Sequence, residues 1–252
     1  MKVIDIKNLQ IGDALGGGFF GDVYACKYNQ KHYAYKEIFE DKPLKTFLSE
    51  KNISKFDELN EMNLKKSITP SLLVKDHTLS GYLSRKADKF DSSFVDDWEE
   101  KYNILIQIKE AMLELHSNKV IHTDIYSGNI LRKGEDYFLC DFDNATIGNN
   151  NPDLNFLSVL AYDFLDARGL SKDLDIYMFN NLTFQFLSDT GKTLDDTEAI
   201  MAIIRKKYGI FTSREQRKIC DSLLPHNLST SFNSDLLIDT INISKVKRKK
   251  RF

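Results

Sequence analysis

Residues 122–131, HTDIYSGNIL, and residues 139–143, LCDFD, are the two stretches that decide how this chain folds. An apolar strand pattern joins them, so two neighbouring loops each present side-chain oxygen atoms. Asp124 in the first loop can accept a proton from an attacking hydroxyl group. Asn129 and Asp141 carry hard oxygen ligands of the type that Mg²⁺ prefers beside phosphate groups. A base beside two metal ligands indicates phosphoryl-transfer chemistry, which depends on positioning and charge more than on covalent help from the protein.

These loops resemble those of the protein-kinase-like superfamily, whose catalytic loop reads H-R-D-L-x-x-x-x-N and whose metal loop reads D-F-G. Thr123 replaces the arginine, and Asp143 replaces the glycine. The resemblance implies ATP and Mg²⁺ as the bound nucleotide and metal. It also implies that Asp124 is the catalytic residue and that Asn129 and Asp141 hold the metal.

The resemblance further implies an α+β, bilobal fold. We expect a β-rich N-lobe in residues 1–88, a mostly helical C-lobe in residues 89–244 and a basic, disordered tail in residues 245–252. No A-P-E motif follows the metal loop, and an apolar helical pattern starts at Asp153. We therefore expect a very short activation segment, with Asp153 opening the next helix and bracing the catalytic loop. Such a site would be constitutively assembled or switched by a partner protein.

The composition describes an ordinary soluble protein. The chain has 252 residues, of which 42% are hydrophobic and 29% charged, with a formal net charge of −2. This balance gives no reason to expect nucleic-acid binding. Three scattered cysteines, Cys26, Cys140 and Cys220, indicate reduced thiols in a cytosolic setting. The sequence shows neither a signal peptide nor an apolar run of about 20 residues, so we expect a cytoplasmic protein without a transmembrane helix; secretion by a non-standard route stays open.

A glycine-rich hairpin is predicted within residues 9–39, where strand patterns flank GGGFFGDV at 16–23. Glycines at Gly16, Gly18 and Gly21 let a backbone approach a phosphate, and Val23 would cover an adenine ring. A G-x-G-x-x-G pattern also occurs in dinucleotide-binding folds, but there a helix follows the glycines, and here a strand pattern follows. A plain glycine-rich hairpin is the alternative.

The resemblance places three more residues near the nucleotide. Ala34 and Lys36 lie where the family has its V-A-I-K strand, and Lys36 would hold the α- and β-phosphates. The alternative for Lys36 is a solvent-exposed strand lysine. Glu50, on a predicted helix in residues 44–60, resembles the helix glutamate that pairs with this lysine, while Glu58 and Glu61 are rivals for that role.

Two further residues, His122 and Asp143, lie beside the predicted catalytic residues. His122 is predicted to be structural, bonding the backbone around the metal loop. Asp143 is either a second metal ligand or a turn carboxylate, and the loop composition after it favours the turn.

A long helix is predicted in residues 97–118 and leads into the catalytic loop. Its apolar stripe is expected to be part of the core.

Three functions are compatible with these residues. The first is a protein kinase acting on Ser or Thr. The second is a small-molecule or glycan hydroxyl kinase similar to the lipopolysaccharide-core kinases or to the aminoglycoside and choline phosphotransferases. The aminoglycoside and choline enzymes also carry an acidic third metal-loop residue, and Tyr126 stands where Ser/Thr kinases have a lysine. The third is a pseudokinase that serves as a binding module. It is disfavoured because the four residues expected to carry the chemistry are all present: Lys36, Asp124, Asn129 and Asp141. The tail, with six Lys or Arg among residues 245–252, is a solvated end or a contact to an anionic surface.

Overall fold

The computed structural model describes residues 1–18, 20–39, 50–90, 95, 98–148 and 158–188. The strands of the N-terminal part form one sheet in the order β1-β5-β6-β4-β3-β2. Their bounds are Lys2–Asp5 for β1, Gln10–Gly17 for β2, Gly21–Tyr28 for β3, Lys31–Ile38 for β4, Pro70–Lys75 for β5 and Leu79–Arg85 for β6. A short 3₁₀ helix, η1, spans Ile6–Asn8. All neighbouring strands are antiparallel except β1 and β5, which are parallel.

The glycine-rich segment is a hairpin, as predicted. Strand β3, not a helix, follows the glycines, which excludes the dinucleotide-binding alternative. Strands β3 and β4 are joined by Asn29 and Gln30, which have φ angles of 47° and 63°. Two consecutive left-handed residues match the twist of a tight antiparallel hairpin, and asparagine tolerates this conformation.

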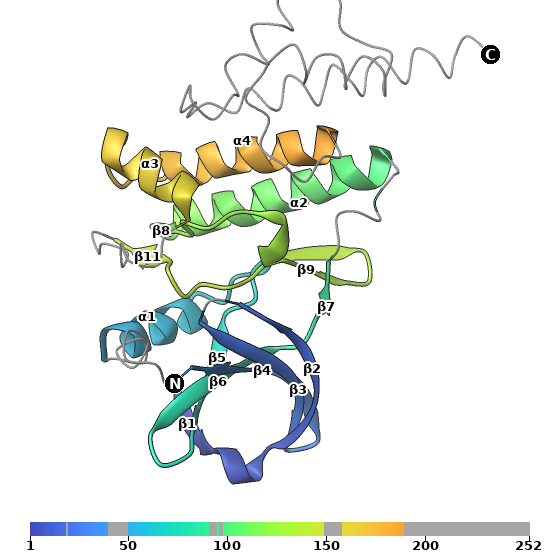
Figure 1. Cartoon of the computed structure of the whole chain (residues 1–252), viewed down its shortest axis with the longest axis vertical. Coiled ribbons are helices and arrows are strands. Elements are labelled where there is room, and N and C mark those ends of the chain that lie inside the picture. The colour runs from blue at the N-terminus through green and yellow to red at the C-terminus, as the bar shows by residue number, and fades with distance from the viewer. Residues whose placement is uncertain (19, 40–49, 91–94, 96–97, 149–157, 189–252) are drawn as a thin grey trace, which may run out of the picture.

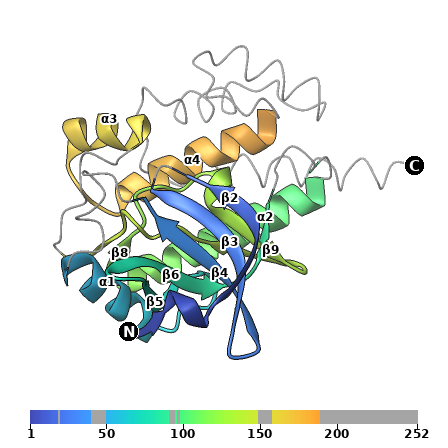
Figure 2. The same cartoon turned by 60° about the horizontal axis from the view of Figure 1, so that its bottom comes forward.

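Helix α1, Glu50–Glu61, packs beside the sheet next to β5 (Figures 1 and 2). It overlaps the helix predicted for residues 44–60 and ends one residue after it, and residues 44–49 of that prediction are outside the described ranges. On this helix Phe56 and Leu59 are completely buried, and the Phe56 ring packs edge to face against Tyr82 of β6 at 5.3 Å between centroids. The same helical spacing that predicted the element therefore anchors it to the sheet.

The remaining described elements form a mostly helical part on the other side of the molecule (Figure 1). Its helices are α2 at Trp98–Ser117, α3 at Val159–Arg168, α4 at Asp173–Ser188 and the 3₁₀ helix η3 at Ser127–Asn129. Its short strands are β7 at Asp88–Lys89, β8 at Val120–Ile121, β9 at Ile130–Lys133, β10 at Asp136–Leu139 and β11 at Thr146–Ile147. Strand β6 ends at Arg85, three residues before the boundary at residue 88 that we predicted between the lobes.

Helix α2 confirms the most regular of the predicted helices. Leu105, Ile108, Met112 and Leu115 on its stripe are at most 1% exposed. A polar contact adds to this packing, because Lys101, itself 1% exposed, donates from Nζ to the carbonyl of Phe186 on α4 at 3.0 Å. Helices α2 and α4 therefore form the base on which the loops of the candidate site rest. Among the helices in the described ranges, none is long and apolar enough to cross a bilayer.

Ser158 caps α3, accepting at Oγ from the N–H of Ala161 at 3.3 Å, and this helix begins at Val159. The helix start predicted at Asp153 falls on residues that the structure does not describe. Residues 189–244 of the predicted helical C-lobe and the basic tail also lie outside the described ranges.

Candidate active site

The catalytic loop is held in a strained backbone conformation. Thr123 has a φ angle of 67°, a left-handed value that is unusual for a β-branched residue. The N–H groups of His122 and Thr123 both donate to the carboxylate of Asp175, each at 2.9 Å. Asp175 lies in the first turn of α4, is completely buried and also contacts Nε2 of His116 at 2.9 Å. One buried carboxylate on a helix thus fixes the loop from below.

Asp175 was missed in the sequence. It binds the catalytic-loop N–H groups in the way that we had expected of Asp153, which itself lies outside the described ranges. The length of the activation segment stays a prediction, because residues 149–157 also lie outside those ranges. The acidic start of α4 was the only signal, and any helix can begin with aspartates because they suit its dipole.

His122 joins the catalytic loop to the metal loop. Its Nε2 donates to the carbonyl oxygen of Cys140 at 2.9 Å, and its Nδ1 accepts from the N–H of Asp124 at 3.3 Å. Both ring nitrogens are therefore used in backbone contacts. The ring also meets that of Phe142 edge to face at 4.8 Å between centroids. The prediction of a structural histidine is confirmed.

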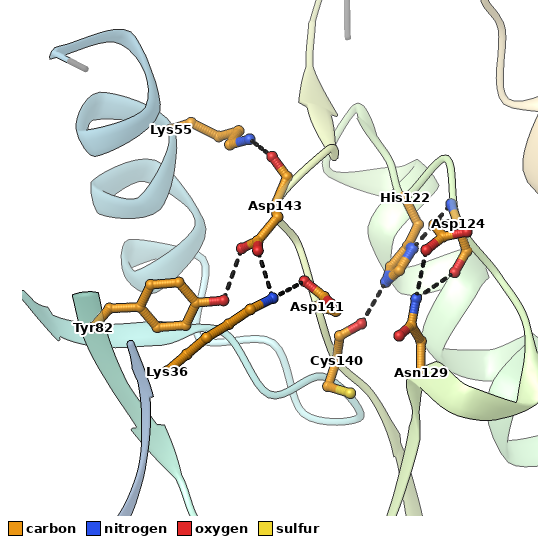
Figure 3. Close-up of polar contacts among 9 residues, drawn as sticks. All are labelled: Lys36, Lys55, Tyr82, His122, Asp124, Asn129, Cys140, Asp141 and Asp143. Atoms are coloured by element: carbon orange, nitrogen blue, oxygen red, sulfur yellow. Dashed lines mark hydrogen bonds and ion pairs between the residues drawn. The ribbon is translucent and has the colours of Figure 1, made fainter. Parts of the chain in front are cut away.

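Asp124 and Asn129 are joined directly. The Nδ2 atom of Asn129 donates to the carbonyl oxygen and to Oδ2 of Asp124, both at 2.9 Å (Figure 3). The turn of η3 brings the two residues together across five positions. Burial raises the pKa of Asp124 above the ordinary aspartate value, with the nearby His122 and Asn129 opposing it. A raised pKa makes this carboxylate a better proton acceptor near neutral pH.

The metal loop presents Asp141 to the space between the two parts. Asp141 follows β10 and has a φ angle of 63°. Its side chain is 31% exposed, and its Oδ1 accepts from Nζ of Lys36 at 2.8 Å. Burial would raise the pKa of Asp141, but the ammonium group of Lys36 outweighs it and lowers that pKa.

Lys36 is buried against two carboxylates, which excludes the alternative of an exposed strand lysine. It is 8% exposed, and its Nζ also donates to Oδ2 of Asp143 at 2.5 Å (Figure 3). Burial alone would lower the pKa of Lys36, but the charges of Asp143 and Asp141 raise it above the ordinary lysine value. Lys36 is thus an ammonium group held at the metal loop, 105 positions along the chain from Asp141.

Asp143 is neither a simple turn residue nor an open metal ligand, which corrects the interpretation that we favoured. Its backbone lies in a turn, but its side chain is 2% exposed. Besides Lys36 it accepts at Oδ1 from the hydroxyl of Tyr82 at 2.7 Å, so both oxygens are occupied. Burial and the charge of Asp141 raise the pKa of Asp143 to about 6 against the opposing effect of Lys36.

The glutamates proposed as partners of Lys36 have different outcomes. Glu58 is exposed and its Oε1 accepts from Ser54 at 3.5 Å, and Glu61 is also exposed. Neither is the partner of Lys36. Glu50 opens α1, but its side chain lies outside the described part of the chain.

The three glycines of the hairpin have different surroundings. A Cβ atom added at Gly16 or Gly18 would meet nothing within 4 Å, so these positions leave open space for a ligand. A Cβ atom at Gly21 would lie 1.8 Å from the carbonyl oxygen of Glu37, so this glycine is required by the close approach of β4. The N–H of Gly18 donates to the carbonyl of Gly21 at 2.9 Å and shapes the turn.

The other two residues predicted near the nucleotide lie on the same sheet. Val23 pairs with Lys36 across β3 and β4, and with Gly16 across β2 and β3. Ala34 of β4 is 9% exposed and precedes Lys36 by two positions, so both face the same side of the strand.

Asn129 and Asp141 suit a divalent cation. Within the described ranges, no group of three or more His, Cys, Asp or Glu side chains is placed to hold a metal. The Nδ2 atom of Asn129 is committed to Asp124, which leaves the amide oxygen on the side of the metal loop (Figure 3). One carboxylate and one amide oxygen fit a cation such as Mg²⁺, which keeps water and takes its further ligands from substrate phosphates.

Comparison with known proteins agrees with this geometry. The family model for the protein kinase domain matches residues 9–248. Aurora kinase A-A from Xenopus laevis is 25% identical over 88% of this chain, and Aurora kinase from Yarrowia lipolytica is 26% identical over 72%. Tyrosine-protein kinase SPK-1 from Girardia tigrina is 24% identical over 78% of the chain. The chain spans 58% of the Xenopus relative, 52% of the Yarrowia relative and 42% of the Girardia relative. The match of the family model over nearly the whole chain shows that this protein belongs to the protein kinase domain family.

Proposed function

We propose that this protein transfers the γ-phosphate of ATP to a hydroxyl group of a protein, with Mg²⁺ as the metal and Ser or Thr as the acceptor. The observation that carries the proposal is the meeting of Lys36 with Asp141 at 2.8 Å, because it joins the glycine-hairpin sheet to the metal loop. Phosphoryl transfer needs a cation at the phosphates, a metal and a base in one place. The protein kinases among the relatives support a protein acceptor.

Each residue has a role in this proposal. Lys36 binds phosphate oxygens, while Gly16 and Gly18 leave room for them. Asn129 and Asp141 hold Mg²⁺, which neutralises developing charge on the phosphate groups. Asp124 takes the acceptor proton at Oδ1, since its Oδ2 already accepts from Asn129.

A small-molecule or glycan hydroxyl is the second candidate acceptor. Tyr126 is 47% exposed in the catalytic loop, where Ser/Thr kinases carry a lysine. An aromatic ring there can pack against the apolar C–H face of a sugar, and the acidic third residue of the metal loop is shared with aminoglycoside and choline phosphotransferases.

One experiment separates these acceptors. The purified full chain is incubated with γ-labelled ATP and Mg²⁺, alone and with pools of proteins or of sugars and aminoglycosides, and the labelled product is identified. We expect phosphoserine or phosphothreonine on protein, and phosphotyrosine would correct the acceptor side chain. Label only on a small molecule would favour the second candidate, and Mg·ATP binding without transfer to any pool would indicate a pseudokinase.

The basic tail, residues 245–252, is proposed to contact an anionic membrane or protein surface. Each Lys or Arg near an anionic membrane contributes about 1 kcal/mol, and salt screens this attraction. Deleting the tail should weaken binding to vesicles containing phosphatidylserine at low ionic strength and leave ATP binding unchanged. Equal vesicle binding by the full and shortened chains across a salt series would leave only a solvated end. The cytoplasmic location stays a prediction.

A further inference from the structure

The carboxylates that hold Lys36 belong to the metal loop. Both of its hydrogen bonds within the described part of the chain go there, to Asp141 and to Asp143. The carboxylates of α1 that the structure describes are engaged elsewhere or exposed: Asp57 pairs with the amino group of Met1, Glu58 with Ser54, and Glu61 is exposed. Lys36 is therefore positioned by the loop rather than by these acids of the helix.

The two loop carboxylates differ in exposure, and this separates their roles. Asp141 is 31% exposed, so a cation can reach it. Asp143 is 2% exposed, and both of its oxygens already accept hydrogen bonds. When Asp141 is engaged by a metal, Asp143 is the counter-ion that stays with Lys36.

Asp143 is itself fixed from two sides. The hydroxyl of Tyr82 on β6 donates to its Oδ1 at 2.7 Å, and the Tyr82 ring is packed against Phe56 of α1. From α1, the ammonium group of Lys55 donates to the backbone carbonyl of Asp143 at 2.5 Å (Figure 3). Helix α1 therefore presents a cation to the metal loop, and the metal loop presents an anion to Lys36.

We propose that Asp143 is the positioning residue of Lys36 and that α1 acts on Lys36 through Lys55 and the metal-loop backbone. In this arrangement a shift of α1 displaces the Asp143 carbonyl, and with it the carboxylate that aims Lys36 at the nucleotide. This inference rests on the proposed function for its consequence in ATP binding, but the coupling between Lys36 and Asp143 exists without nucleotide.

The first test uses thermal unfolding without nucleotide. Lys36→Met, Asp143→Asn and the double variant are compared with wild type. Each single change leaves a buried charge with fewer partners, whereas the double change removes both members of the pair. We expect the melting temperature of the double variant to fall by less than the sum of the two single decreases. The difference should be about 4 °C or more. Additive losses would overturn the proposal.

The second test measures Mg·ATP affinity by calorimetry. Asp143→Asn keeps the shape and an acceptor for Tyr82 but loses the charge, so the dissociation constant should rise about tenfold. The matched control is Asp136→Asn. Asp136 pairs with Lys66 at 2.7 Å, but its side chain is 60% exposed. The dissociation constant of this variant for Mg·ATP should therefore stay within about twofold of wild type. Equal affinity of wild type and Asp143→Asn would contradict the proposal.

A third variant, Lys55→Met, tests the helix and stays informative if Asp143→Asn does not fold. It should weaken Mg·ATP binding by about threefold, because a charge-assisted hydrogen bond to the loop backbone is lost. Unchanged affinity in this variant would remove α1 from the account. If wild type itself binds no Mg·ATP, the proposed function fails, and the ligand-free cycle still decides whether Asp143 and Lys36 act as a pair.

Discussion

The catalytic loop and the cluster of Lys36, Asp141 and Asp143 are fixed in different ways. In the catalytic loop, Asp175 and His122 bind backbone groups, so the strained turn at Thr123 is fixed by hydrogen bonds to peptide N–H and C=O groups. In the cluster, the ammonium group of Lys36 lies between two carboxylates, so ion pairs between side chains fix its position. The comparison shows that Asp124 follows a turn fixed by backbone hydrogen bonds, whereas Lys36, which we propose binds phosphate, is placed by ion pairs beside helix α1.

Removing the brace of the catalytic loop should have the largest effect on stability. Asp175→Ala leaves the N–H groups of His122 and Thr123 buried without their acceptor, at about 1–3 kcal/mol for each group. We expect a loss of about 3 kcal/mol or more of unfolding free energy by urea titration, with Asp175→Asn losing clearly less. A loss below 1 kcal/mol for Asp175→Ala would show that the loop does not depend on this residue.

The exposed carboxylate of the cluster should matter for chemistry more than for stability. Asp141→Asn should lower phosphoryl transfer by about 10²-fold or more, because the metal loses its charged ligand. It should also abolish any rise in melting temperature that Mg²⁺ gives in the presence of ATP. Its unfolding free energy should change less than that of Asp143→Asn, because Asp141 is 31% and Asp143 2% exposed. The reverse order of stability would contradict the division of roles between the two carboxylates.

The glycine hairpin offers a matched pair of variants. Gly21→Ala forces a Cβ atom against the carbonyl of Glu37 and should cost about 1–3 kcal/mol of stability. Gly16→Ala meets no neighbouring atom, so its stability should match wild type while Mg·ATP affinity falls. Thermal unfolding and calorimetry on both variants measure this. Equal Mg·ATP affinity for Gly16→Ala and wild type would exclude a phosphate contact at that position.

The smallest expected effect is a pH dependence of the unfolding free energy that comes from Asp143. The pKa of Asp143 is raised to about 6 from an ordinary value of 3.8, so between these values the folded protein binds a proton that the unfolded chain does not. Stability from this group therefore increases as the pH falls from about 7 to about 5, by about 1 kcal/mol relative to Asp143→Asn. Asp141, whose pKa is lowered, acts in the opposite direction only near and below pH 4. A difference between the two proteins that stays constant over this range would contradict a raised pKa at Asp143.

The sequence predicted the elements whose signals are local. Asp124 and Asn129 lie five positions apart, and the stripe of α2 follows one helical period, so their arrangement depends on short-range geometry. The order of hairpin, lysine strand, long helix and two loops was enough to predict the bilobal fold. The structural role of His122 also followed, because its backbone partners are set by the same loops.

The contacts that cross the molecule were not predictable in this way. Asp175 lies 53 positions after His122, and Asp143 lies 107 positions after Lys36. Nothing in the local pattern distinguishes an aspartate at a helix start that binds a distant loop from one that suits the helix dipole. Resemblance directed attention to a glutamate on α1, whereas the contact with the metal loop among the described side chains of α1 comes from Lys55.

We propose that the two regions have separate roles, with Asp124 serving the chemistry and Lys36 binding the nucleotide. Single-turnover transfer from γ-labelled ATP, measured at saturating Mg·ATP alongside the dissociation constant, tests it in wild type and Asp124→Asn. We expect Asp124→Asn to transfer phosphate about 10²–10⁴-fold more slowly, with its Mg·ATP affinity within about twofold of wild type. Transfer at the wild-type rate by Asp124→Asn would contradict the account.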